Sequence, residues 1–91
     1  MGTDTACVGA RALLRREFAK EIADRLPHLE ALRCCPGQAA LQLARRDAHT
    51  LASSAWVVGE PELSRVAREV EHQLPAGPVD ELLSLLRNWT P

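Results

Sequence analysis

His49 is the residue of this chain whose type and setting best suit covalent chemistry. It lies in a segment from Arg45 to Gly59 that contains no proline and has the periodicity of a helix. At about 100° per residue, the small apolar side chains of this helix share one face. They are Leu41, Ala44, Ala48, Leu51 and Ala55. His49 lies about a quarter-turn from them, so the pattern places an imidazole at the boundary between a helix-packing core and solvent.

The side chains on the same side as His49 are mostly polar or basic. They are Gln42, Arg45, Ser53 and Trp56, with Arg46 somewhat further round the helix. Arg45 lies one turn before His49, and its guanidinium donates charge-assisted hydrogen bonds to anions. Ser53 is expected to bond either the imidazole or its own helix backbone. Trp56 is expected either to anchor a partner or to cover the end of the core.

A histidine needs little further machinery to carry a phosphoryl group, because a neutral imidazole nitrogen is a nucleophile and unperturbed histidine is largely neutral at pH 7. The chain has no glycine-rich phosphate loop and no paired-carboxylate site. We therefore expect no ATP site and no cofactor. Cys34 and Cys35 could bind a metal with His28, but they lack Cys-x-x-Cys spacing, so we expect free thiols and no metal. We interpret His28 and His72 as surface residues.

The order of these features resembles the histidine-containing phosphotransfer (HPt) domain family over about residues 10 to 90. The matching motifs are Ala-His-Thr-Leu at 48–51, Ser-Ser-Ala at 53–55, Gly-Glu-Pro-Glu-Leu at 59–63 and Val-Ala-Arg-Glu-Val-Glu at 66–71. The resemblance implies that His49 accepts a phosphoryl group from a receiver aspartate or a kinase and passes it to a response regulator. The implied partners are a receiver domain, which would supply Mg²⁺, and a sensor histidine kinase.

Two positions depart from the family pattern. The family usually has lysine three residues after the histidine and glycine four residues after it, where this chain has Ala52 and Ser53. With Ala52 in the lysine position, Arg45 is the expected phosphoryl-stabilising residue. A degenerate HPt-like adaptor or inhibitor, which docks a receiver or kinase without phosphotransfer, is therefore an alternative function. An unrelated structural or oligomerisation bundle is a second alternative. A histidine-kinase dimerisation domain ranks lower, because Thr50 stands where that class has glutamate.

Length and composition restrict the class of protein. A chain of 91 residues predicts one domain, and an aromatic content of 3% predicts an aliphatic core. The net charge of −1 gives no electrostatic case for binding nucleic acid or an anionic membrane. No segment approaches the ~20 apolar residues that span a bilayer, and the N-terminus lacks a signal-peptide core. We therefore expect a cytoplasmic monomer without membrane contact.

The breakers of the chain predict an all-α fold, an antiparallel up-down four-helix bundle over residues 10–91 that follows a flexible tail at 1–9. The expected helices are about 10–33 with a kink or short break near Pro27, 38–58, 61–74 and 79–89. They are separated by the clusters at 34–37 and 75–78 and by Gly59. Short connections favour antiparallel neighbours.

Overall fold

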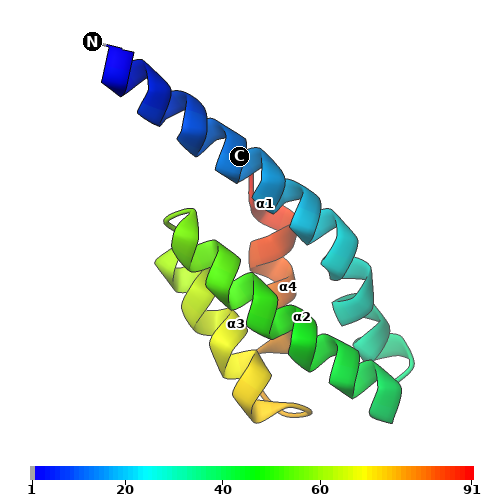
Figure 1. Cartoon of the computed structure of the whole chain (residues 1–91). Coiled ribbons are helices and arrows are strands. Elements are labelled where there is room, and N and C mark those ends of the chain that lie inside the picture. The colour runs from blue at the N-terminus through cyan, green and yellow to red at the C-terminus, as the bar shows by residue number, and fades with distance from the viewer. Residues whose placement is uncertain (1) are drawn as a thin grey trace.

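The chain folds into four helices, in a computed structural model that describes the backbone of residues 2–91 and the side chains of residues 9–91 (Figure 1). The helices are α1 (Gly2–Cys34), α2 (Gln38–Val57), α3 (Pro61–Gln73) and α4 (Val79–Asn88). No strand occurs between residues 2 and 91, which confirms the all-α expectation. The predicted tail at 1–9 falls partly outside the described residues. Its backbone is helical from Gly2, so α1 begins earlier than expected.

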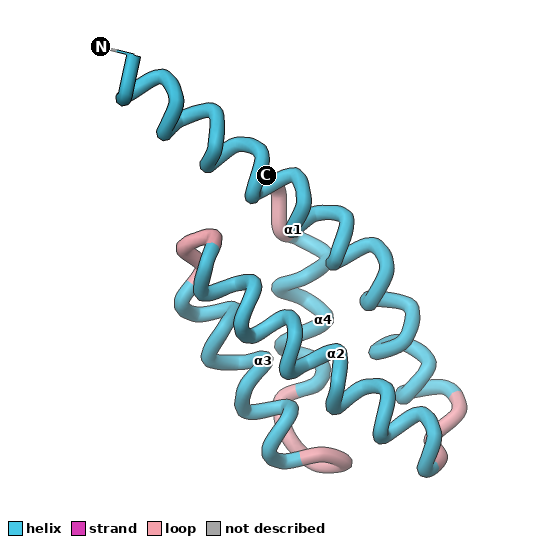
Figure 2. The backbone as a smooth tube through the Cα atoms, in the orientation of Figure 1, coloured by secondary structure: helices cyan, strands magenta, loops and turns pink. Residues whose placement is uncertain are grey.

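The helices form an antiparallel bundle in which each one packs against its neighbours in the chain and α1 also packs against α4 (Figure 2). The most extensive contact is between α2 and α3. The N-terminal part of α1 extends beyond the other three helices, which gives the molecule an elongated shape of 52 × 19 × 19 Å (Figure 1). The predicted up-down order of the helices is therefore confirmed.

Pro27 bends α1 without interrupting it. The helix is continuous from Gly2 to Cys34 and contains Pro27 in its interior. Proline has no backbone N–H, so the carbonyl of Ala23 loses its helical partner at this point. The last third of α1 turns away from the line of its first part (Figure 2). Of the two expected outcomes, a kink and a short break, the structure has the kink.

The core is aliphatic apart from one aromatic pair. Its largest fully buried apolar side chains are Phe18, Leu29, Leu51, Leu82, Leu86, Val66 and Val70. Phe18 meets Trp89 edge to face, with ring centroids 4.9 Å apart and planes at 85°. Leu14 lies at the edge of the bundle, where its side chain is 46% exposed beside Ser53 and Val57 of α2.

The turn at Gly59 sets α3 beside α2. Gly59 has φ of +82°, a left-handed conformation that glycine adopts without a Cβ penalty, and it follows Val58, the C-cap of α2. Pro61 then occupies the first turn of α3, where its missing N–H costs nothing. On the outer face of α3, Arg65 donates to Glu69 over 2.7 Å. The tight reversal brings the exposed face of α2 next to that of α3.

Candidate functional site

His49 stands on the exposed face of α2 and is held by one carboxylate of α3. Its Nδ1 lies 2.6 Å from Oε2 of Glu71 and 3.1 Å from Oε1. The His49 side chain is 71% exposed, whereas that of Glu71 is only 14% exposed. An ionised carboxylate can only accept, so the proton of a neutral His49 ring lies on Nδ1. The lone pair of the ring is then on Nε2, for which the described residues provide no partner.

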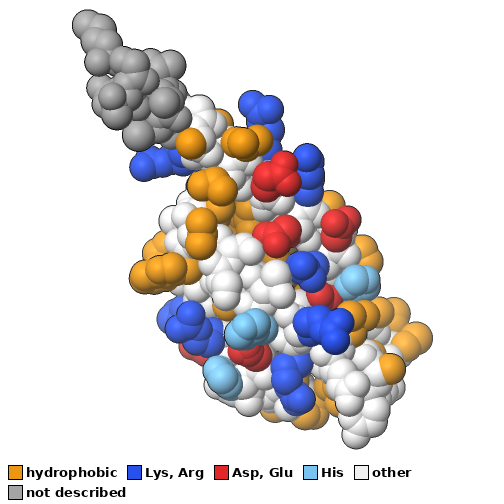
Figure 3. Space-filling model, viewed as in Figure 1, with side chains coloured by type: hydrophobic (Ala, Val, Ile, Leu, Met, Phe, Trp, Pro, Cys, Tyr) orange, Lys and Arg blue, Asp and Glu red, His pale blue; other side chains and the backbone are white. Residues whose placement is uncertain are grey.

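The surroundings of His49 are basic. A shallow surface hollow contains this ring, and it is lined by Gln42, Arg45, Arg46, His49, Glu71 and His72. Figure 3 shows two histidines side by side on this face, with lysine or arginine side chains around them. Neither arginine of the hollow forms an ion pair within residues 9–91. The structure thus brings three of the predicted site residues, Gln42, Arg45 and Arg46, to the predicted histidine.

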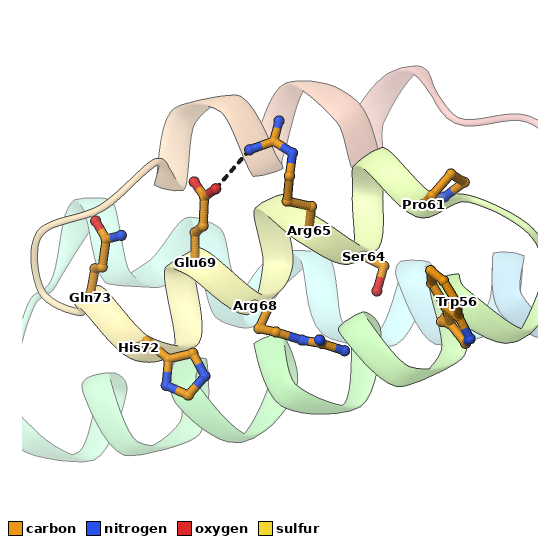
Figure 4. A pocket seen from close by; sticks show the side chains of 8 residues that line it. All are labelled: Trp56, Pro61, Ser64, Arg65, Arg68, Glu69, His72 and Gln73. Atoms are coloured by element: carbon orange, nitrogen blue, oxygen red, sulfur yellow. Dashed lines mark hydrogen bonds and ion pairs between the residues drawn. The ribbon is translucent and has the colours of Figure 1, made fainter.

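Trp56 and Ser53 lie outside this hollow. Trp56 is 68% exposed, so it does not cover the core, and it lines a neighbouring hollow between α2 and α3 (Figure 4). Ser53 lines a different depression on the α1 side of α2, beside Leu14 and Val57. Its hydroxyl makes no hydrogen bond within the described side chains, so neither of the two bonds expected for it is present. The structure therefore separates both residues from the imidazole.

Ala52, at the position where the family usually has lysine, is turned inward. Its side chain is 4% exposed and lies in the core. Its carbonyl accepts a hydrogen bond of 2.7 Å from the Ser64 hydroxyl of α3. This position forms part of the α2–α3 seam and supplies no cation to the surface.

A second histidine–carboxylate pair, on the other side of α2, was not predicted. Asp47 is buried, and it accepts from Nη1 of Arg25 and from Nδ1 of His28, each over 2.7 Å. His28, interpreted from the sequence as a surface residue, is 43% exposed, but its pairing with Asp47 was not foreseen. On the helical wheel Asp47 lies next to Leu51, within the apolar side. An acidic residue at such a position indicates a buried partner, and this signal could have revealed the cluster.

Glu71 is the functional residue that sequence reasoning did not assign. The glutamate was part of the quoted motif, but its contact with His49 joins residues of two helices across 22 positions. That contact depends on the register between α2 and α3, which no local pattern specifies. The two adjacent cysteines, which were considered as metal ligands, do not form a site. Cys34 and Cys35 are exposed and unpaired, and no potential metal-binding group of three side chains occurs within the described ranges.

Comparison with known proteins assigns the family. None of the helices described is long and apolar enough to cross a membrane. Neither the curated proteins nor the solved structures give a match. The model of the Hpt domain matches residues 13–89, which include all of α2, α3 and α4 and most of α1. The chain therefore belongs to the Hpt domain family, whose members serve histidine phosphotransfer in two-component phosphorelays.

Proposed function

We propose that this chain is a phosphoryl carrier that accepts a phosphoryl group on Nε2 of His49 and passes it to a response regulator. The observation that carries the proposal is the state of the imidazole. Its Nδ1 is occupied by Glu71, and its side chain is 71% exposed. A ring oriented through one nitrogen and accessible at the other is prepared for nucleophilic attack.

The transfer step requires no base. The Nε2 lone pair attacks the phosphorus of an aspartyl phosphate, the N–P bond forms, and the P–O bond to the carboxyl breaks with its electron pair remaining on the aspartate. The phosphorylated imidazole keeps its Nδ1 proton, which is already directed at Glu71. No proton has to move, so the step runs in either direction between two receiver aspartates.

The charges around the ring favour a phosphoryl anion. Arg45 and Arg46 line the same hollow and are exposed. A guanidinium donates strong, often bidentate hydrogen bonds to phosphate oxygens. Arg45 is our first choice for a phosphoryl-stabilising residue on α2, as the sequence predicted. Arg45→Ala should slow phosphoryl gain or shorten the lifetime of phosphohistidine, and equality with wild type in both would reject this role.

The partner would be a receiver domain that brings the acceptor carboxylate and Mg²⁺, with a sensor histidine kinase as a second possible donor. A monomer in the cytoplasm would suffice for this role. Gln42, which is exposed in the hollow of His49, and Trp56, which is exposed in the neighbouring hollow, would then serve docking.

One observation favours a second function, that of an adaptor which docks without transfer. Ala52 is buried and presents no cation where the family usually has lysine. If the remaining arginines do not replace that charge, the domain would still bind a receiver or a kinase and would block it. Binding without phosphate gain distinguishes this function from the carrier.

The decisive experiment incubates the purified chain with a ³²P-labelled phosphoreceiver. We expect acid-labile, base-stable phosphate on His49 and none on the His49→Gln variant. His72→Gln is the matched control, because His72 lines the same hollow and is equally exposed. Label that survives in His49→Gln and disappears in His72→Gln would refute the site. Binding of the receiver without any label would establish the adaptor instead.

A further inference from the structure

We propose that Arg68 of α3 is a phosphoryl-binding residue, which supplies from the neighbouring helix the positive charge that position 52 of α2 lacks. The inference rests on the proposed function and names one more group of the same site. Arg68 was part of a quoted sequence motif, but nothing in the pattern along the chain separated it from Arg65, the other arginine of the helix.

The register of α2 and α3 places Arg68 beside the reacting histidine. Two contacts fix that register: Glu71 with His49, and Ser64 with the carbonyl of Ala52. Arg68 lies four residues after Ser64 and three before Glu71, so it shares the face of α3 that makes both contacts. In an antiparallel pair, a residue between these two contacts lies opposite the segment of α2 between Ala52 and His49. Arg68 therefore lies beside the segment of α2 between Ala52, which carries no charge, and His49.

The side chain of Arg68 is free to act there. It is exposed and forms no ion pair with any side chain from residue 9 onward. Its neighbour Arg65 is already paired with Glu69 over 2.7 Å. Figure 4 shows the difference: Arg65 points away from α2 toward Glu69, whereas Arg68 extends toward α2 and Trp56. Of the two arginines on this helix, only Arg68 is directed to the α2 side.

The hollow that contains Arg68 adjoins the hollow of His49. Arg68 and Trp56 line the first, His49 and Arg45 line the second, and His72 lines both. A long, flexible guanidinium can move from one to the other by changing rotamer, and it can then donate two parallel hydrogen bonds to phosphoryl oxygens. Arg45 approaches the ring from its own helix and Arg68 from α3, so together they would hold the phosphoryl group from two sides.

The test loads His49 from a small donor, which avoids the choice of a receiver. Phosphoramidate transfers its phosphoryl group to the Nε2 lone pair and releases ammonia. We would measure the initial rate of phosphohistidine formation and its half-life in wild type, Arg68→Ala and Arg68→Lys. Arg65→Ala is the matched control, since it removes an arginine of the same helix that points the other way. Circular dichroism melting would verify that all variants fold.

We expect Arg68→Ala to load roughly threefold more slowly, the scale of one exposed charge interaction with an anion. Arg68→Lys should recover most of the rate and Arg65→Ala should match wild type. The deficit should shrink in about 1 M salt, which screens exposed charges and would not correct a structural defect.

Three results would overturn the inference. Arg68→Ala could load at the wild-type rate, Arg65→Ala could lose as much as Arg68→Ala, or the deficit could persist unchanged in high salt. In each case phosphate on wild-type His49 would still support the proposed function. If wild-type His49 takes no phosphate from phosphoramidate, the proposed function and this inference both fail.

Discussion

The two faces of α2 carry the same chemical pair in different surroundings. On the side of α1, Nδ1 of His28 meets Asp47 at 2.7 Å, and on the side of α3, Nδ1 of His49 meets Glu71 at 2.6 Å. The carboxylate of the first pair is almost completely buried and is also bonded by Arg25. In the second pair the carboxylate is 14% exposed and the ring is 71% exposed.

In the first pair the histidine stabilises a buried carboxylate, whereas in the second pair the carboxylate orients an exposed histidine. Buried Asp47 requires donors to offset the loss of its hydration, and Arg25 and His28 supply them, so that pair ties α1 to α2. At the second pair, Glu71 orients a ring that faces solvent and arginines. A histidine–carboxylate contact alone does not identify a site. The exposure of the ring, 71% at His49 against 43% at His28, and the arginines around it do.

The strongest contrast is expected in phosphate gain. His49→Gln should abolish labelling by a phosphoreceiver completely, because the amide of glutamine has no nucleophilic lone pair of comparable strength. His28→Gln should be labelled as wild type, since its ring serves Asp47. Quantified phosphate on both variants measures this. Loss of label in His28→Gln, with the fold intact, would remove the distinction between the two faces.

The next largest effect is expected in stability, at the buried pair. Asp47→Asn keeps the volume but leaves Arg25 and His28 facing an amide that is uncharged and offers a donor to one of them. We expect a loss of about 2 kcal/mol in the free energy of unfolding. Urea denaturation followed by circular dichroism measures it. A variant as stable as wild type would show that this cluster does not hold α1 to α2.

A smaller, kinetic effect is expected at Glu71. Glu71→Ala removes the group that fixes the tautomer and orientation of His49 and should reduce the loading rate roughly tenfold, the scale of lost orienting contacts around a reactive histidine. Glu71→Gln retains a carbonyl acceptor for Nδ1–H, so it should lose much less. Phosphoramidate loading distinguishes the two variants. Equal rates in both would mean that the charge of Glu71, and not its acceptor oxygen, prepares the ring.

The sequence was sufficient for what depends on neighbours along the chain. The spacing of Ala44, Ala48 and Leu51 predicted the buried face of α2, and the same wheel put Arg45 and Gln42 with His49. Gly59 and the Pro61 turn were predicted because their backbone requirements are local. These features follow from helical periodicity and cap chemistry, which a single sequence contains.

What the sequence did not contain is the register between helices. Glu71 and Arg68 belong to the site only because α3 packs against α2 with Ser64 at Ala52 and Glu71 at His49. Asp47 can be buried because two side chains of α1 donate hydrogen bonds to it, Arg25 from before the kink at Pro27 and His28 from just after it. The side chains that meet across the seams depend on how the whole core packs.

The smallest expected effect is the difference between the two histidines in their contribution to the free energy of unfolding. His28→Ala leaves buried Asp47 with Arg25 as its single remaining donor, and we expect a loss of about 1 kcal/mol in the free energy of unfolding, the value of one hydrogen bond to a buried acceptor. His49→Ala removes a side chain that is mostly in solvent, so its effect should stay within about 0.5 kcal/mol. Paired urea denaturation of the two variants measures the difference. The order of the two losses matters more than either value, because the structure predicts that the mostly exposed ring of His49 contributes less to the fold than the ring of His28, which bonds buried Asp47. A larger loss at His49 than at His28 would contradict that division.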